Sequence, residues 1–407
     1  MVGLWLAILL NISLVTTLVV CGNKNRYTFY RIDHKVNIMI VIHYIPSIDQ
    51  NFGGVSSYLQ LLAHSLGKMA DLHIITHHSD KELNLDNCTI HYMECGQLQW
   101  FKAKKLFCRL LDEIKPDIVH VNSCWAPLCS FTVFWAKKRG IPTVVSPHGM
   151  LEPWVLAKNH WTKKLPALIM YQKRALRKAD ALIATAESEK ANLLKLKYND
   201  KVEVVPNGVI VDGIEIKKSW ERTHSLLYMG LLRPNKGAGV LIDALSLIKD
   251  KLHGYKVIIA GPDTEGYLST LKRMCDKYGL NDIVSFPGGV FGKEKWTLMQ
   301  HADFFILPTL NENFGIVIAE AYLSGTPVIT CKGAPWACIN EQSIGWWIER
   351  TPEKVAAAIG EALDCSEQTA EDKGRRGREY VIQHFSSDKV AKVMMEKYTL
   401  IIKQEVY

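Results

Sequence analysis

The most informative part of this chain is the stretch Pro308-Thr-Leu-Asn-Glu-Asn-Phe-Gly-Ile-Val-Ile-Ala-Glu320. It follows an apolar run over residues 302–307, which is typical of a buried strand, and leads into residues 315–324, which have helical spacing. Asn313, Phe314 and Gly315 therefore lie at a predicted helix N-terminus. Free backbone N–H groups and the helix dipole at such a place favour a bound phosphate.

Two carboxylates flank this predicted phosphate site. Glu312 stands just before the helix, and Glu320 lies inside it, about two turns further along the same side. One carboxylate can reach a sugar hydroxyl on one side of the phosphates, and the other can reach a ribose on the far side. The pattern predicts a nucleotide-sugar pocket, although a solvated helix with two ordinary glutamates is the alternative interpretation.

This stretch resembles the Glu-x7-Glu signature of the retaining glycosyltransferases of family 4, of the kind found in bacterial surface polysaccharide biosynthesis. The resemblance extends from about Val36 to the C-terminus and leaves only residues 1–35 outside. It implies a GT-B fold, in which two Rossmann-like doubly wound domains face a cleft. It also implies that the last helix crosses back to the first domain.

Length and composition agree with two globular domains. A chain of 407 residues is too long for one ordinary core, and its 48% hydrophobic and 22% charged content is that of a globular protein. The ten cysteines are scattered without zinc-binding spacing, which favours a reducing compartment. The sequence has no Asp-x-Asp triplet to hold a divalent metal, which predicts metal independence. The net charge of +8 is modest, and no nucleic-acid-binding motif appears, so we expect no nucleic-acid partner.

Strand and helix patterns alternate along both halves, which predicts an α/β protein with parallel sheets. The alternation stops at the turn cluster around Asn207 and then restarts. Strands are expected at 37–43, 72–76, 118–121, 143–146, 181–184 and 202–205, and then at 225–229, 257–260, 283–286, 304–307 and 327–330. The expected domains are a leader at 1–35, an acceptor-side domain at 36–206, a donor domain at 207–385 and a crossing helix at 386–407.

The N-terminal leader is predicted to be a hydrophobic helix. Residues 2–21 are uncharged and mostly apolar, and twenty helical residues span about 30 Å, the thickness of a bilayer core. Lys24, Arg26, Arg31 and Lys35 follow it and predict an N-out, C-in anchor that holds the enzyme at the cytoplasmic side of the inner membrane. A start codon placed too early is the alternative explanation.

Two motifs of the first domain are expected to face the cleft. Gly53 and Gly54 follow the first strand and open a helix, where glycine lets the backbone approach a ligand, although an ordinary tight turn fits equally well. His148 ends a buried strand and is followed by glycine, which aims it at the cleft, unless it only caps the strand. The resemblance implies that His148 bonds the transferred sugar and that the glycine loop faces the donor phosphate.

The second domain offers two cations after its first strand. Arg233 and Lys236 lie three residues apart on a strand-to-helix loop and can clamp a diphosphate leaving group. The common family pattern has arginine directly after the glycine, where this chain has Leu231, so the equivalence of Arg233 is less secure. The resemblance further implies donor-binding roles for Asn207 and Gly288, although an asparagine in an interdomain turn is most often structural.

A basic helix is predicted within residues 158–178. Seven lysines and arginines occur there without an intervening acid, and aromatic residues are interleaved. Such a helix can lie on an anionic membrane or meet the pyrophosphate of a lipid-linked acceptor; a solvated helix face is the alternative.

We therefore expect a metal-independent retaining glycosyltransferase. We expect its donor to be a nucleotide-diphosphate sugar and its acceptor to be a glycan, in particular a lipid-linked glycan of capsule, exopolysaccharide or lipopolysaccharide synthesis. His148, Arg233, Lys236 and Glu312 would be catalytic. Two alternatives stay open: a catalytically silent nucleotide-sugar-binding subunit of a glycan assembly complex, and another GT-B enzyme such as a nucleotide-sugar epimerase.

Overall fold

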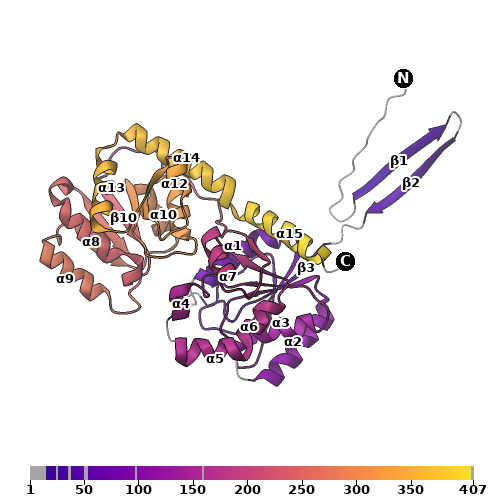
Figure 1. The fold of residues 1–407 in the computed structure, drawn as a ribbon. Coiled ribbons are helices and arrows are strands. Elements are labelled where there is room, and N and C mark those ends of the chain that lie inside the picture. The colour runs from indigo at the N-terminus through magenta and orange to yellow at the C-terminus, as the bar shows by residue number, and fades with distance from the viewer. Residues whose placement is uncertain are drawn as a thin grey trace.

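A computed structural model describes residues 15–23, 26–34, 38–49, 54–96, 99–157 and 160–404 of the chain. The two main β-sheets are parallel, and each is covered by helices on both faces (Figure 1). The predicted α/β class with two doubly wound domains is confirmed.

The first sheet contains seven parallel strands among the described residues, in the order β5-β4-β3-β6-β7-β8-β9. The strands are β3 (Ile40–Tyr44), β4 (Asp71–Thr76), β5 (Thr89–Tyr92), β6 (Ile118–Asn122), β7 (Thr143–Ser146), β8 (Ala181–Ala184) and β9 (Val202–Val204). The helices are α1 (Gly54–Leu66), α2 (Trp100–Ile114), α3 (Pro127–Lys137), α4 (Pro153–Ala157), α5 (Leu165–Ala167), α6 (Lys173–Lys178) and α7 (Glu187–Lys195). Two π-helical segments, His160–Lys164 and Leu168–Gln172, flank α5.

Alternation along the strands builds a core on each face of this sheet. Val41 on β3 packs with α1 on one face, and its neighbour Ile42 packs with α2 and α3 on the other. Successive side chains of a strand point to opposite faces, so a strand buried on both sides reads as a continuous apolar run. This is why most strands of the sheet are visible in the sequence.

The second sheet has the order β12-β11-β10-β13-β14-β15. Its strands are β10 (Ser225–Met229), β11 (Lys256–Ala260), β12 (Val284–Gly288), β13 (Phe304–Leu307), β14 (Val328–Cys331) and β15 (Gly345–Ile348). Its helices are α8 (Ala238–Leu247), α9 (Leu268–Tyr278), α10 (Gly292–His301), α11 (Ile316–Leu323), α12 (Cys338–Glu341), α13 (Pro352–Asp364) and α14 (Glu367–Phe385).

The strand order of each sheet reverses between two neighbouring strands. The reversal lies between β3 and β6 in the first sheet and between β10 and β13 in the second. In open parallel sheets, ligands bind at the carboxyl ends of strands at such a switch point. The loops after β10 and β13 are those that carry Lys236 and Glu312.

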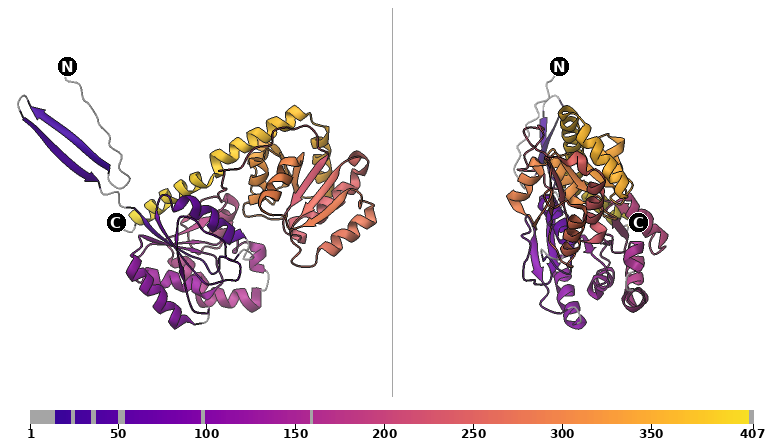
Figure 2. Two further views of the ribbon diagram at one scale, coloured as in Figure 1. Left: turned by 180° about the vertical axis from the view of Figure 1, so that it is seen from behind. Right: turned by 90° about the vertical axis from the view of Figure 1, so that its left-hand side faces the viewer.

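Two segments pass between the sheets side by side. The Val209 amide donates to the Phe385 carbonyl, and the Ser387 amide donates to the Val209 carbonyl, both at 2.8 Å. A Cβ atom on Gly208 would lie 2.9 Å from Ser387 Cα, so this contact requires glycine. Helix α15 (Ser387–Gln404) then runs back along the first sheet and packs beside α1, as Figures 1 and 2 show.

The prediction of a hydrophobic leader helix is wrong over residues 15–21. Strand β1 (Val15–Asn23) occupies this segment and pairs antiparallel with β2 (Arg26–His34), in a hairpin that stands away from both sheets (Figure 1). β-branched residues recur in this part of the sequence, and they favour a strand over a helix. Residues 2–14 lie outside the described residues. Within the described ranges, no helix is long and apolar enough to cross a membrane.

Candidate active site

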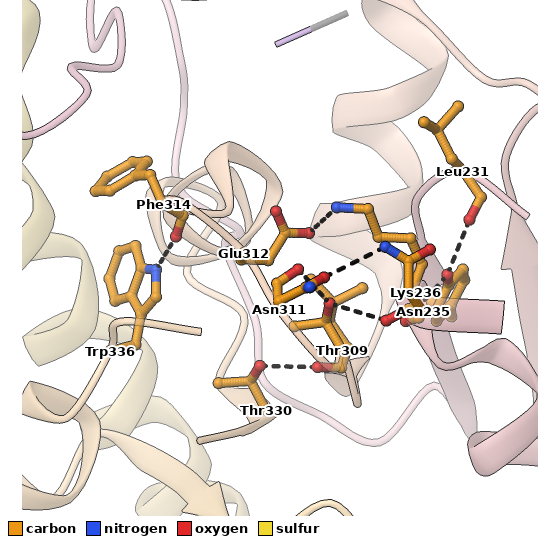
Figure 3. Close-up of polar contacts among 11 residues, drawn as sticks. Leu231, Asn235, Lys236, Thr309, Asn311, Glu312, Phe314, Thr330 and Trp336 are labelled. Carbon is orange, nitrogen blue, oxygen red and sulfur yellow. Dashed lines mark hydrogen bonds and ion pairs between the residues drawn. The ribbon is translucent and has the colours of Figure 1, made fainter. Parts of the chain in front are cut away.

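The loops that follow β10 and β13 are bound directly to each other. The Leu310 amide donates to the Asn235 carbonyl at 2.8 Å, and Asn235 Nδ2 donates to Asn311 Oδ1 at 3.3 Å (Figure 3). Gly237 has a φ of +90°, and a Cβ atom there would lie 2.0 Å from the Pro308 carbonyl oxygen. Glycine therefore lets the two loops approach closely enough to form one site.

Lys236 and Glu312 meet at this junction. Lys236 Nζ lies 2.5 Å from Glu312 Oε1, and the two side chains are only 21% and 15% exposed (Figure 3). The Glu312 amide donates to the Gly333 carbonyl at 2.8 Å, which holds the glutamate backbone in place. The structure thus brings together two of the predicted site residues as a partly buried ion pair.

Glu320 forms a second ion pair, which sequence reasoning missed. Lys295 on α10 places Nζ 2.6 Å from Glu320 Oε1, with side-chain exposures of 21% and 15%. Burial raises the pKa of Glu320 above its ordinary value, while the Lys295 charge opposes that shift. No local spacing predicts this pair, because its two residues lie on different helices, α10 and α11, that become neighbours only in the folded domain.

Aromatic contacts of Phe314 hold the loop before α11 in place. Phe314 is buried against Trp336 and Phe385, at ring-centroid distances of 5.3 and 5.1 Å. The Trp336 indole donates to the Phe314 carbonyl at 2.5 Å (Figure 3). Gly315 caps α11 with a φ of +82°, and no side chain of the described residues caps this N-terminus. Phe314 is therefore an anchor, and only its backbone is suited to a ligand.

Arg233 lies apart from the Lys236–Glu312 pair. Its guanidinium is 3.1 Å from Glu265 Oε1 and donates to the Thr264 hydroxyl at 3.2 and 3.3 Å. Both partners follow β11. A role for Arg233 at the diphosphate, which the sequence suggested with reservation, stays a prediction that requires it to leave these partners.

Glycines end the strands on the other side of the switch point. The Gly261 amide donates to the Gly288 carbonyl at 2.7 Å, and a Cβ atom on Gly261 would lie 1.7 Å from the Gly230 carbonyl oxygen. At the ends of β10, β11 and β12, the backbones of these glycines therefore contact each other with no side chain between them. Gly288, a predicted donor-binding residue, has a φ of +86° at this edge.

His148 occupies the carboxyl end of β7 in the first domain. Its Nε2 lies 3.2 Å from Asn122 Oδ1, and its ring centroid lies 4.5 Å from that of Tyr58. Burial lowers the pKa of His148 to about 3, so the imidazole is neutral at pH 7. Its φ of +52° is rare for a residue with a side chain and shows that the surrounding structure fixes this turn.

Asn313 joins the two domains across the site. Its Nδ2 donates to the His148 carbonyl at 2.5 Å, and a Cβ atom on Gly149 would lie 2.0 Å from its Oδ1. Glu189 holds the same turn from behind, because its Oε1 accepts from the Gly149 amide at 2.5 Å and its Oε2 accepts from the Thr185 amide at 2.8 Å. Sequence reasoning missed Glu189, which is buried in the first turn of α7.

The remaining predicted residues are placed less completely. Gly53 lies outside the described residues, and Gly54 begins α1. Asn207 lies buried beside the crossing segments, and its Oδ1 has no hydrogen-bond partner among the described residues. Within those residues, no group of three or more histidine, cysteine, aspartate or glutamate side chains is arranged to hold a metal ion.

Solved structures define the class of this fold. Two Rossmann-like sheets with sites at their switch points form a GT-B protein. Sucrose-phosphate synthase of Thermosynechococcus elongatus matches 90% of this chain and all of its own length, with a TM-score of 0.71 and 19% identity. This likeness shows the fold alone.

Sequence comparisons then place the chain in its family. Residues 52–212 match the model for Glycosyltransferase Family 4, and residues 214–380 match that for Glycosyl transferases group 1. The chain belongs to the family 4 glycosyltransferases.

Two relatives show how far the likeness extends. Alpha-monoglucosyldiacylglycerol synthase of Streptococcus pneumoniae is 24% identical over 397 residues, which are 88% of each chain. A GDP-mannose-dependent alpha-(1-6)-phosphatidylinositol monomannoside mannosyltransferase of Mycobacterium tuberculosis is 30% identical over 210 residues, 47% of this chain and 54% of that protein. The chain spans about half to three fifths of the length of several curated relatives it matches.

Proposed function

We propose that this protein is a retaining glycosyltransferase that moves a sugar from a nucleotide-diphosphate sugar to an acceptor hydroxyl. The single observation that carries the proposal is the Lys236–Glu312 pair, 2.5 Å apart beside the N-terminus of α11. A cation and free helix amides suit a diphosphate, and a carboxylate beside them suits a sugar hydroxyl. The two relatives described above are named for α-linked glycosyl products, which fits retention.

In this mechanism, Lys236 transfers its contact from Glu312 to the leaving diphosphate. The negative charge that develops as the glycosidic bond breaks is then stabilised by Lys236, by the backbone N–H groups near Gly315 and by Arg233 once it leaves Glu265. Glu312, released from Lys236, accepts a hydroxyl of the sugar. Glu320 accepts a ribose hydroxyl in place of the Lys295 ammonium.

Front-face departure suits this site better than a double displacement. A double displacement requires a carboxylate that attacks the anomeric carbon and forms a covalent glycosyl-enzyme bond. Glu189 is the buried carboxylate nearest in structure to the His148 turn, and both of its oxygens already accept backbone amides. We therefore assign proton removal from the acceptor to the leaving diphosphate, with the acceptor oxygen entering on the same face.

Metal independence belongs to the same proposal. Lys236 and the α11 N-terminus supply the positive charge that a divalent cation supplies in other phosphate-transfer sites. Activity should therefore persist in EDTA. A collapse in EDTA that magnesium restores would refute this part of the mechanism.

The acceptor is proposed to be lipid-linked and to be met at a membrane surface, with the cleft on the cytoplasmic side of the inner membrane. The helical stretch 160–178 exposes three apolar side chains to solvent: Trp161 at 79%, Ile169 at 74% and Met170 at 67%. Lys163, Arg174, Arg177 and Lys178 are exposed on the same stretch. Apolar side chains amid cations suit an anionic bilayer interface. Both relatives are also named for lipid-borne products.

Binding to vesicles tests this surface. Full-length protein should bind vesicles of anionic phosphatidylglycerol and not vesicles of phosphatidylcholine, and binding should fall with salt because the attraction is screened within about 8 Å at physiological ionic strength. Trp161→Ser with Ile169→Ser should reduce binding and leave nucleotide affinity unchanged. Equal binding of wild type and double variant would contradict the assignment of this surface.

A panel of UDP- and GDP-sugars tests the reaction itself. Wild type supplied with membranes as acceptor source should release nucleoside diphosphate from one donor of the panel. A catalytically silent binding subunit would bind the donor without release. An epimerase would convert the donor sugar and keep the nucleotide attached.

A further inference from the structure

Buried polar side chains link His148 to the crossing helix α15 by hydrogen bonds. His148 Nε2 lies 3.2 Å from Asn122 Oδ1, and Asn122 Nδ2 lies 3.0 Å from His43 Nδ1. His43 Nε2 lies 3.0 Å from Tyr398 Oη, and the same hydroxyl lies 2.6 Å from His120 Nδ1. Apart from His148, each of these side chains is 0% exposed, so water does not compete for the bonds.

Most of these hydrogen-bonded side chains lie at the switch point of the first sheet. His43 comes from β3, while Asn122 and His120 come from β6, the strand beside it. His120 Nε2 reaches the Ser146 hydroxyl on β7 at 2.7 Å. Tyr398 comes from α15, which enters from the second domain. One hydroxyl of the crossing helix thus stands between two histidines of the sheet.

The Tyr44 carbonyl indicates which groups donate and which accept along this hydrogen-bonded network. It lies 3.5 Å from Asn122 Nδ2, and a carbonyl can only accept, so the amide nitrogen faces Tyr44 and His43. Asn122 Oδ1 then faces His148, which must donate through Nε2–H. His43 accepts at Nδ1 and donates through Nε2–H to Tyr398.

The donors and acceptors of the remaining hydrogen bonds, from Tyr398 to Ser146, follow from the same orientation of Asn122. Tyr398 Oη accepts from His43, so its own proton is donated to His120 Nδ1. His120 therefore carries its proton on Nε2 and donates it to Ser146. Each donor from His148 to His120 therefore has an acceptor in this arrangement.

All three imidazoles are neutral, so the arrangement concerns tautomers and not charge. Burial lowers the pKa of His43 and of His148 to about 3 and lowers that of His120 well below its ordinary value. Each ring therefore carries one proton at pH 7. The bond that the other nitrogen makes decides where that proton lies.

We propose that Tyr398 is a positioning residue for His148, because through His43 and Asn122 its hydroxyl holds the His148 imidazole as the Nε2–H tautomer. The fixed tautomer leaves Nδ1 of His148 as a hydrogen-bond acceptor. Under the proposed function, on which this consequence rests, His148 accepts a hydroxyl of the transferred sugar instead of donating to it.

Removal of the Tyr398 hydroxyl should release this tautomer. His43 Nε2–H would be left buried without an acceptor, which is unfavourable. The proton can move to Nδ1 of His43 if Asn122 turns its oxygen toward it, and this turn gives up only the long 3.5 Å contact of Asn122 Nδ2 with the Tyr44 carbonyl. Asn122 Nδ2 then faces His148, whose Nε2 must lose its proton to accept. A change on α15 is thereby transmitted to the cleft.

Nitrogen-15 NMR of histidine rings tests the assignment directly. In full-length wild type, the His148 signals, assigned by their loss in His148→Gln, should show the neutral Nε2–H form. Tyr398→Phe keeps the buried ring and should give His148 a mixture of both tautomers. Thr399→Val is the matched control: it also removes one hydroxyl from α15, but among the described residues that hydroxyl bonds the Met395 carbonyl of the same helix, at 2.8 Å, and no other group.

A kinetic measurement separates positioning from packing. Tyr398→Phe should lower kcat about tenfold, the size of one misplaced hydrogen bond, and leave the Kd for free UDP or GDP within about twofold. Thr399→Val should change neither quantity.

Three results would overturn the proposal. One is an Nδ1–H or mixed tautomer of His148 in wild type, which needs no variant and so stands even if Tyr398→Phe fails to fold. Another is a Tyr398→Phe spectrum in which His148 is unchanged. The third is an unchanged kcat in that variant. The NMR result does not depend on turnover, so failure of the proposed function would leave it readable.

Discussion

The two halves of the site use opposite electrostatics. In the second domain, four charged side chains form two partly buried ion pairs, Lys236–Glu312 and Lys295–Glu320. In the first domain, the strand ends carry neutral histidines buried around His148. Charged groups that can exchange partners suit an anionic diphosphate, whereas a fixed neutral network suits a sugar, which carries hydroxyls and no charge. Under the proposed function, the second domain holds the nucleotide, and the transferred sugar lies between Glu312 and the neutral network of the first domain.

Acid should lower the free energy of unfolding of the first domain more than that of the second. The folded-state pKa of His43 and of His148 is about 3, below the unfolded value of about 6.5, so the unfolded chain binds these protons first. This stability is complete above about pH 6.5 and is lost as the pH falls toward 3. With His120 included, the loss between pH 7.5 and 5.5 should be about 4 kcal/mol.

Hydrogen exchange resolved by region measures this difference. At pH 5.5, the amides of the first sheet should lose protection before those of the second, after correction for intrinsic exchange rates. Simultaneous loss in both sheets would show that the buried histidines do not set the acid stability of the first domain.

Lys236→Ala should have the largest effect on turnover. Loss of one charge-assisted contact to the leaving group should cost about 2–4 kcal/mol of barrier, or about 30- to 1000-fold in kcat. Lys251→Ala is the control, since it breaks an ion pair of 2.7 Å with Asp364 whose side chains are 50% and 67% exposed. Turnover of Lys236→Ala within about threefold of wild type would remove Lys236 from the mechanism.

The two glutamates should separate nucleotide binding from sugar binding. Glu320→Ala should weaken the affinity for free UDP or GDP about tenfold, because it removes the proposed ribose acceptor. Glu312→Ala should leave that affinity nearly unchanged and lower turnover of the sugar donor. Calorimetric titration of both variants checks this, and an equal loss of nucleotide affinity in both would contradict the separate roles.

Arg233→Ala is expected to have the smallest effect. The side chain already bonds Glu265 and Thr264, so its contact with the diphosphate must replace an existing ion pair. A loss of kcat below about tenfold is expected, smaller than that of Lys236→Ala. A larger loss in Arg233→Ala than in Lys236→Ala would reverse the ranking of the two cations.

Much of the fold was predictable because buried parallel strands read as apolar runs. Four predicted strands have the same bounds as β7, β8, β10 and β13, namely 143–146, 181–184, 225–229 and 304–307. The missed strands β5 and β15 lie at sheet edges, where burial is partial and the apolar run is weak. The helix prediction for the leader was wrong for a different reason. An apolar run is compatible with a helix or a strand, and the β-branched residues of this run favour the strand.

The site was predictable where its residues follow a strand directly. Lys236, Glu312 and His148 each lie close to a strand end that the sequence reveals. Lys295, Glu189 and Tyr398 could not be found in this way, because each lies on a helix and reaches the site through packing between elements far apart in sequence. A buried tyrosine or glutamate on a helix has no local signal that tells a site partner from an ordinary core or surface residue.

The most direct test of the division between the two halves is a single comparison of His148→Asn with wild type. Affinity for free UDP or GDP is measured by calorimetry, and release of nucleoside diphosphate from the accepted sugar donor is measured by kinetics. The division predicts an unchanged nucleotide Kd in His148→Asn together with a loss of turnover of about 100-fold. A nucleotide Kd that weakens as much as in Glu320→Ala, or a turnover that stays at the wild-type level, would contradict it.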